Sequence, residues 1–326
     1  MECRFSRVCK MKLIIQIPCY NEEKTLPEVI RDLPRDLPGV DSIEYLVIDD
    51  GSSDNTVEVA RQLGVHHVLS LGSNQGLATA FLAGIRRCLG LGADVIVNTD
   101  GDNQYQGNCI RDLIAPIMAG RQDIVVGARP ISDIEHFSWL KKKLQQFGSR
   151  VVRQFSGTDI PDTTSGFRAY AADAAMKLHV FNRYTYTLET IIQAGHMNVR
   201  IGHVGIKVNP KTRESRLISS IPRYVWRSGS IILRSYITYK PLRTFFYLSL
   251  ILGLAGFALG LRWLYLGAHG HEPSLILASV LLISAFLMLV LGIMADLISA
   301  NRKLIQETLF STRSQLYKKD KKENDK

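Results

Sequence analysis

The sequence is poor in the patterns that build a disulfide framework or a cysteine and histidine metal centre. Its 326 residues include five cysteines and eight histidines, without a Cys-x-x-Cys pair and without a metal-ligand spacing among the histidines. An odd, unpatterned set of cysteines fits a reducing compartment. Residues 1–11 form a short polar extension with no apolar core, so no signal peptide is expected, and Met11 is an alternative start.

Charge is missing from two long runs near the C-terminus. No charged residue occurs in Thr244–Leu261 or in Leu275–Ala295. Each run approaches or exceeds the roughly 18 to 20 residues that cross a bilayer core. Both runs are apolar on every face and contain Gly, Ala and Ser, as packed membrane helices do. Residues 243–300 therefore predict two transmembrane helices, over about 243–266 and 275–299, with a buried helical hairpin as the alternative.

Lys and Arg are absent from the link between these runs and abundant on either side of them. Nine lie between Lys207 and Arg243, and eight follow Asn301. By the positive-inside rule, both termini and the domain before the spans are expected to be cytoplasmic. The net charge of +10 then faces the lipid bilayer, and no nucleic acid partner is expected. We expect a two-pass protein of a bacterial or archaeal cell membrane, or of the ER membrane in a eukaryote.

Residues 12–215 alternate apolar, β-branched runs with helical patterns. This alternation predicts an α/β fold with a mostly parallel, Rossmann-like sheet and flanking helices. The expected strands are Lys12–Pro18, Ile43–Asp49, Val65–Leu71, Val95–Thr99 and Ile124–Gly127, with a further extended segment at Val199–Val208. The expected helices are residues 26–33, Asn55–Leu63, Gly76–Leu89, Ile110–Met118, Trp139–Phe155 and Thr187–Ala194.

The remaining segments are basic and lie next to the predicted spans. Residues 216–242 mix Arg with aromatic and aliphatic residues, which is typical of an amphipathic helix in the headgroup plane. Residues 301–326 form a basic cytoplasmic tail, and its charged end, residues 318–326, is expected to be disordered. Small residues in the spans permit association between copies of the chain, so a homo-oligomer is open.

Two acidic strings follow predicted strands about fifty residues apart. They are Val47–Ser52, which contains Asp49 and Asp50, and Thr99–Gln104, which contains Asp100 and Asp102. Open α/β sheets bind ligands at the carboxyl ends of their strands. Carboxylate oxygens suit a divalent cation, which would offset the charge of a departing diphosphate. A solvated Asp-Gly turn is the alternative interpretation of the second string.

Four motifs together resemble glycosyltransferase family 2. They are Ile17–Glu23, Val47–Ser52, Thr99–Gln104 and Thr164–Arg168, in the order and spacing of the polyprenyl-phosphate branch, which is similar to dolichyl-phosphate mannose synthase. The resemblance covers about residues 12–240, and the two trailing spans resemble those of bacterial members. It implies a GT-A-type domain that takes a sugar from a nucleotide-diphosphate sugar, with Mg²⁺ or Mn²⁺ as cofactor.

The resemblance also implies roles for individual residues. Those expected in the nucleotide-sugar pocket are Pro18, Tyr20, Glu22, Ile48, Asp50, Asp100, Gly101, Asp102, Arg129, Arg213 and Arg216. Asp50 would accept a hydrogen bond from the base, and Asp100, Asp102 and Gln104 would be the metal ligands. Residues 73–76 resemble a loop near the donor. Tyr20 and Glu22 have a helix-start cap as their alternative role.

Two basic positions are implied contacts of phosphate groups. Arg129 would contact phosphate oxygens, with a solvated surface arginine as the alternative, and Lys142 falls where the family has a second arginine that binds the acceptor phosphate. Arg213 and Arg216 match a basic segment that closes over the diphosphate, with a juxtamembrane charge role as the alternative. Asp162 would help to orient the acceptor.

The implied reaction is an inverting transfer of the sugar to an undecaprenyl or dolichyl phosphate at the cytoplasmic membrane face. Asp100, Asp102 and Arg129 would carry the catalysis. A phosphate monoester is already largely ionised near neutral pH, so no general base is required. The alternatives are a transferase that elongates a lipid-linked saccharide and a non-catalytic membrane scaffold with a nucleotide-sugar pocket.

Overall fold

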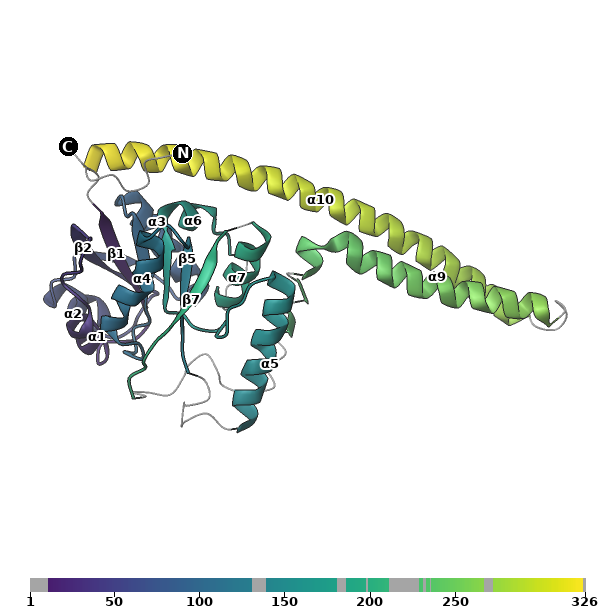
Figure 1. Ribbon diagram of the computed structural model, residues 1–326, viewed down its shortest axis with the longest axis horizontal. Coiled ribbons are helices and arrows are strands. Elements are labelled where there is room, and N and C mark those ends of the chain that lie inside the picture. Colours follow the sequence, from purple (N-terminus) through teal and green to yellow (C-terminus); the bar gives the residue numbers. More distant parts are fainter. Residues whose placement is uncertain are drawn as a thin grey trace. The chain divides into compact units, whose positions relative to one another are not determined.

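The computed structural model describes residues 11–130, 139–180, 186–197, 199–210, 229–230, 233–234, 236–266 and 272–324. The chain forms two compact units (Figure 1). One comprises residues 1–232 and 310–326 and is called the catalytic unit after the domain that the sequence predicts. The other comprises residues 233–309 and is called the membrane unit after its two predicted spans.

A seven-stranded sheet forms the centre of the catalytic unit. Its order is β3-β2-β1-β4-β6-β5-β7. The strands are β1 (Lys12–Cys19), β2 (Ser42–Asp49), β3 (His67–Ser70), β4 (Val95–Asn98), β5 (Ile124–Ala128), β6 (Arg168–Ala171) and β7 (Ile201–Gly205). All pairs are parallel except those that β6 makes with β4 and β5. The predicted α/β fold with a mostly parallel sheet is therefore confirmed.

Helices cover both faces of this sheet. On one face, side chains of α1 (Leu26–Asp32), α2 (Thr56–Gln62) and α4 (Ile110–Met118) pack in a single core cluster. On the other face, α3 (Leu77–Gly90), α6 (Ala172–Lys177) and α7 (Thr187–His196) contribute to a second cluster. The apolar runs predicted as strands are buried on both sides for this reason.

The clearest departure from expectation is β6, which the sequence analysis did not predict, together with α6 directly after it. β6 has only four residues, Arg168–Ala171, which are an arginine, two alanines and a tyrosine, so it carries no run of β-branched residues. Its register pairs Asn98 of β4 with Arg168 in the antiparallel sense. Because β6 runs opposite to β4, the segment that precedes β6 lies at the same sheet edge as the carboxyl end of β4.

The membrane unit contains α9 (Pro241–Tyr265) and the first part of α10 (Glu272–Asn324). Both helices are long and apolar enough to cross a membrane, with mean hydropathies of 2.0 and 2.8 in their apolar windows, of which 6% and 17% is buried. Low burial does not fit the core hairpin of a soluble domain. Small residues form the contact between the two helices, since a Cβ added at Gly256 would lie 3.0 Å from the carbonyl oxygen of Ala278.

The expectation of disorder at the C-terminus is wrong for the described residues. α10 continues as helix to Asn324. Within the catalytic unit, Arg313 Nη1 donates to the carbonyl oxygens of Met176 and Leu178 at 2.9 and 3.3 Å, and Lys321 pairs with Asp94. These contacts order a segment whose composition alone favours disorder, because they pair its charges with groups on the domain.

We expect Arg313→Met to destabilise the catalytic unit by about 1–3 kcal/mol, because two part-buried carbonyl groups lose their donor. Thermal unfolding of the full chain in detergent should show a midpoint lower by several degrees, at roughly 2–4 °C per kcal/mol. Lys318→Met is the matched control, since Lys318 lies on the same helix and is exposed. An equal midpoint for both variants would contradict the docking contact.

Candidate active site

Parallel pairing brings three chemically distinct loops to one edge of the sheet. β1 lies between β2 and β4, with Pro18 opposite Ile48 and Gln16 opposite Asn98. The loops that leave the carboxyl ends of β1, β2 and β4 therefore start side by side. They carry Tyr20 to Glu22, Asp50 to Ser52, and Asp100 to Gln104, respectively. Both acidic strings thus lie at the ligand-binding edge of an open α/β sheet.

The loop after β1 is held against the loop after β2 by backbone hydrogen bonds. Asn21 has a left-handed backbone with φ of 55°, and its N–H donates to Ser52 Oγ at 2.9 Å. The N–H of Glu22 donates to Thr56 Oγ1 at 2.8 Å. Pro18 and Glu22 are buried, whereas the Tyr20 side chain is 39% exposed. The Tyr20 ring is therefore accessible at this edge of the sheet, and its contact with a nucleotide remains a prediction.

Asp50 holds the start of α3 in this structure. Its Oδ1 accepts the N–H of Gln75 at 2.7 Å, and its Oδ2 accepts the N–H of Gly76 at 2.9 Å. Burial is the largest influence on the pKa of Asp50 and raises it, although both N–H groups favour the charged form. Ile48 is fully buried below it. The loop of residues 73–76 thus lies against the carboxyl end of β2. Its resemblance to a loop near the donor remains a prediction.

The Asp100-Gly101-Asp102 turn packs closely against the end of β1. A Cβ added at Gly101 would lie 3.1 Å from Cys19 Sγ and 3.4 Å from the carbonyl oxygen of Pro18. The Thr25 hydroxyl lies 2.7 Å from the carbonyl oxygen of Gly101 and from Glu22 Oε2. A methyl group at this position would therefore fit only with small shifts of these neighbours, so the acidic turn lies close to β1.

The acidic turn fits a divalent cation that takes part of its coordination from a substrate. Asp100 and Asp102 are half-buried. Within the described part of the chain, no group of three or more His, Cys, Asp or Glu side chains is placed to hold a metal ion. Mg²⁺ in phosphate-handling sites is commonly held by one or two carboxylates together with phosphate oxygens. Two carboxylates are therefore a suitable ligand set if a diphosphate supplies the remaining oxygens.

The side-chain oxygen of Gln104 accepts a hydrogen bond within the protein. Its backbone N–H donates to Asp102 Oδ1 at 3.2 Å, and its Oε1 accepts a long 3.5 Å hydrogen bond from Arg129 Nη1. An amide oxygen that also ligated a metal would compete with this arginine for the same lone pairs. The metal-ligand role of Gln104 remains a prediction.

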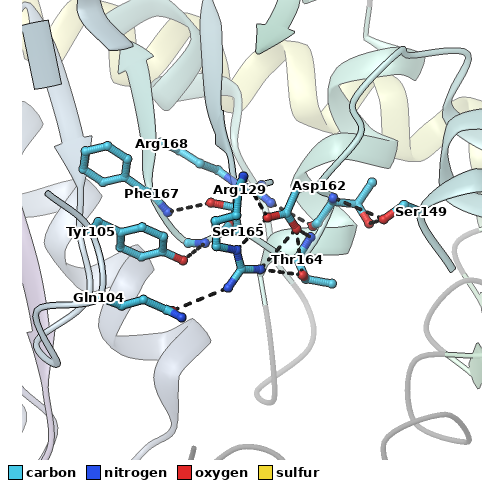
Figure 2. A network of polar contacts seen from close by, with 11 residues as sticks. Gln104, Tyr105, Arg129, Ser149, Asp162, Thr164, Ser165, Phe167 and Arg168 are labelled. Atoms are coloured by element: carbon cyan, nitrogen blue, oxygen red, sulfur yellow. Dashed lines mark hydrogen bonds and ion pairs between the residues drawn. The ribbon is translucent and has the colours of Figure 1, made fainter. Parts of the chain in front are cut away.

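A buried ion pair joins the loop after β5 to the loop before β6 (Figure 2). Arg129 Nε lies 2.7 Å from Asp162 Oδ2, and Arg129 Nη2 lies 3.2 Å from Asp162 Oδ1. Arg129 Nη2 also donates to Thr164 Oγ1 at 2.9 Å. The two charged side chains are 8% and 0% exposed, so Arg129 is not a solvated surface arginine.

The pairing determines the protonation of Asp162. Burial by itself would raise the pKa of Asp162, but the facing Arg129 guanidinium and the hydrogen bonds from Arg129 and Thr164 hold that pKa below its ordinary value. Asp162 is therefore a carboxylate at neutral pH. Sequence reasoning expected Asp162 near the acceptor and Arg129 near phosphate, but it did not predict that each would be the other's partner.

A second arginine shapes the same segment from below. Arg168 is fully buried, and its guanidinium donates to the carbonyl oxygens of Thr163, Ser165 and Thr187 and to Thr190 Oγ1, at 2.7 to 3.0 Å. Four of its five N–H groups are therefore used within the protein, and its complete burial keeps it away from the surface at which a substrate would bind. Its function is to fold residues 163–165 into a tight loop that supports Asp162 and Thr164.

The loop before β6 also touches the acidic turn. A Cβ added at Gly166 would lie 2.8 Å from Asp100 Oδ1 and 3.1 Å from the Tyr186 hydroxyl. Asn98 Nδ2 donates to the carbonyl oxygen of Gly166 at 2.9 Å and lies 2.8 Å from the Tyr186 hydroxyl. Sequence reasoning missed Asn98 and Tyr186. A polar residue in the otherwise apolar run of β4 was the available signal for Asn98, and Tyr186 had none.

Other predicted site residues lie outside what the structure describes. Arg213 and Arg216 belong to residues 211–228, which are not described. Lys142 lies in α5 (Trp139–Ser156). For residues 139–147 the structure describes the helix but not the side chains. The roles of these three basic residues remain predictions.

A mostly parallel sheet that carries paired carboxylates and a buried arginine at the carboxyl edge of its strands is the architecture of a GT-A-type sugar transferase. Residues 14–178 match the family described as glycosyl transferase family 2. The chain belongs to this family, and the resemblance seen in its motifs is confirmed.

Curated relatives carry the similarity beyond the matched family segment. The undecaprenyl-phosphate mannosyltransferase of Micrococcus luteus is 30% identical over 222 residues, which are 65% of this chain and 89% of that protein. The UDP-N-acetylglucosamine–dolichyl-phosphate N-acetylglucosaminyltransferase of Methanococcus voltae is 30% identical over 212 residues, which are 59% of this chain and 83% of that protein.

Solved structures agree on the fold. Glucosyl-3-phosphoglycerate synthase from Mycobacterium tuberculosis, in complex with Mn²⁺, UDP and glucosyl-3-phosphoglycerate, superposes with a TM-score of 0.53. The match covers 68% of this chain and 80% of that one at 18% identity. At this identity the likeness establishes the arrangement of the sheet and helices.

We expect Asp162→Asn to destabilise the catalytic unit by about 3–5 kcal/mol at pH 7, because Arg129 is left buried without its counter-charge. The folded pKa of Asp162 is lowered, so its contribution to stability is complete above the unfolded pKa of about 3.9 and is lost as the pH falls below that value. Unfolding at a series of pH values should show the difference from wild type shrinking below about pH 4. A constant difference would contradict the ion pair.

We expect Gly166→Ala to lower turnover by about tenfold or more while the protein stays folded, since the added methyl group would displace the Asp100 carboxylate. Steady-state kinetics with varied Mg²⁺ or Mn²⁺ should show a higher metal concentration at half-maximal rate. The matched control is Gly148→Ala, because nothing lies within 4 Å of the Cβ that this substitution adds. Unchanged kinetics for Gly166→Ala would contradict the contact with Asp100.

Proposed function

We propose that this chain transfers a sugar from a nucleotide-diphosphate sugar to a polyprenyl phosphate at the cytoplasmic face of a membrane. The observation that carries the proposal is the convergence of the Asp100-Gly101-Asp102 turn, the loop after β1 and the Asp50 loop at one sheet edge. The mannosyl and N-acetylglucosaminyl transferases named above act on undecaprenyl and dolichyl phosphate, and they support this acceptor class.

The donor would lie across the carboxyl ends of β1, β2 and β4. Tyr20 offers an exposed ring for a base, and Pro18, Ile48 and Asp50 form the floor near it. The diphosphate would lie near the acidic turn, where Gly101 lets the chain approach closely. A bound Mg²⁺ or Mn²⁺ held by Asp100 and Asp102 would supply charge stabilisation for the departing diphosphate.

The acceptor side would be formed by the segment from Asp162 to Gly166. Arg129 donates hydrogen bonds through Nε to Asp162 and through Nη2 to Thr164. Its Nη1 points towards Gln104, beside the acidic turn. We infer that Nη1 faces phosphate oxygens when substrates bind, with Asp162 holding the guanidinium in place. Arg213, Arg216 and Lys142 would add positive charge near these phosphates.

The chemistry requires no proton transfer. A phosphate monoester with a second pKa of about 6 is largely a dianion at neutral pH and attacks as it stands. One of its oxygens would form a bond to the anomeric carbon, while the bond from that carbon to the diphosphate oxygen breaks and its electron pair leaves with the nucleoside diphosphate. In-line displacement inverts the anomeric carbon. The two apolar helices, with both termini cytoplasmic, would keep the site near the lipid acceptor.

We expect Asp102→Ala to lower sugar transfer by about a thousandfold or more, because a negatively charged ligand is lost where leaving-group charge develops. Membranes would be incubated with labelled nucleotide sugars and polyprenyl phosphate, and the lipid fraction analysed. Asp36→Ala, at an exposed aspartate, is the control. EDTA should abolish activity, and Mg²⁺ or Mn²⁺ should restore it.

Four outcomes would contradict the proposal or a part of it. Normal turnover by a folded Asp102→Ala protein, or activity that persists in EDTA, would remove the metal assignment. Donor binding without transfer to any lipid phosphate would favour a non-catalytic scaffold, and transfer only to a lipid-linked saccharide would favour an elongating enzyme.

A further inference from the structure

The membrane unit contains buried hydrogen-bond donors that have no acceptor among the described residues. Nε and Nη2 of Arg302 and Nε2 of Gln306 are all buried, and none of them has a hydrogen-bond partner among the described residues. Gln306 is 6% exposed. Arg302 and Gln306 are four residues apart on α10, so their side chains share one face of the helix. Buried donors are nearly always paired, so this cluster requires an explanation.

Neighbouring contacts hold the Arg302 side chain in place. Its guanidinium carbon lies 4.5 Å from the centre of the Tyr239 ring. One turn earlier, Ser299 Oγ donates to the carbonyl oxygen of Thr238 at 3.1 Å. α10 is thereby joined to the segment that leads into α9. A guanidinium that stacks its face on an aromatic ring keeps its N–H donors in its own plane, so the contact with Tyr239 satisfies none of them.

Elsewhere in this chain, other arginines bind a carboxylate through the same two nitrogens that lack a described partner in Arg302. Arg129 uses Nε and Nη2 for the two carboxylate oxygens of Asp162, and Arg200 uses the same two atoms for Asp123. This edge of a guanidinium matches two oxygens of a carboxylate or a phosphate. The nearby carboxylates of α10, Asp296 and Glu307, are both exposed and form no described ion pair with Arg302.

The position of the cluster along α10 identifies the class of ligand. Arg302 follows the uncharged run Leu275–Ala295 by seven residues, or about two helical turns. In a helix that spans a bilayer, this position is at the depth of the lipid headgroups, whose phosphates are the most abundant oxyanions there. Gln306, one turn further, adds a neutral N–H donor to the two of Arg302.

We propose that Arg302 and Gln306 bind the phosphate group of a membrane lipid. The ligand is a phosphate monoester if it is a polyprenyl phosphate, and a phosphodiester if it is an anionic phospholipid. The inference rests on the proposed insertion of the two apolar helices into a membrane, but not on sugar transfer. A binding measurement therefore tests it independently of the proposed reaction.

The experiment uses the full chain, stripped of lipid in an uncharged detergent and titrated separately with phosphatidylglycerol and with a polyprenyl phosphate. We expect Arg302→Met to weaken binding of at least one of the two lipids by about tenfold or more, because a bidentate, charge-assisted contact is lost. Gln306→Met, which removes one neutral donor at similar size, should weaken it by about threefold. The matched control is Lys303→Met, which removes the same charge from an exposed neighbour and should leave affinity within about twofold.

The two titrations distinguish the sources of the phosphate. Weaker binding of polyprenyl phosphate alone identifies the carrier as the ligand, whereas weaker binding of phosphatidylglycerol, alone or with the carrier, identifies a headgroup site. Wild-type affinity for both lipids in folded Arg302→Met overturns the proposal, as does an equal loss in Lys303→Met. If Arg302→Met does not fold, Gln306→Met decides, and unchanged affinity in that variant overturns the proposal.

Discussion

The parallel pairing of β1 with β2 on one side and β4 on the other is the constraint on which the candidate site depends. Parallel strands end at the same edge of a sheet. Three loops that are far apart in the sequence therefore begin on adjacent strands, one strand spacing from each other. The residue types on these loops are ordinary in isolation: an aspartate on a backbone N–H, an Asp-Gly turn and an exposed tyrosine. Their joint position places carboxylates, a backbone turn and an aromatic ring at one edge of the sheet, where we propose that the nucleotide diphosphate binds.

The reversal of β6 brings a further loop, residues 162–167, to this edge. An antiparallel strand between β4 and β5 brings the loop before it next to the loops after its two neighbours. Asp162 therefore meets Arg129, and Gly166 meets Asp100. Taking both charges of the Arg129–Asp162 pair out of water is costly, so the pair requires two hydrogen bonds of good geometry and the added donor of Thr164. Such a pair holds two loops in one arrangement.

The same physical rule explains why Arg302 stands out in the membrane unit. Buried guanidinium groups in the catalytic unit have acceptors for the donors that point inward, as Arg129 and Arg168 show. Arg302 has an aromatic ring beneath it and, among the described residues, no acceptor at its Nε and Nη2 edge. A buried edge without an acceptor is costly, and a lipid phosphate is the acceptor that we propose for it.

Sequence by itself determined the alternation of strands and helices, the two apolar spans, the acidic strings and the membership of the family. These properties depend on local periodicity and on motif order, which neighbouring residues specify. Tertiary structure alone decided the direction of β6, the pairing of Arg129 with Asp162, the support of Gly166 by Asn98 and Tyr186, and the helical state of residues 318–324. Each of these depends on which distant groups meet after folding. A short strand that begins with arginine, or a charged tail that docks on a domain, has no local signal, because its stability comes from partners elsewhere in the chain.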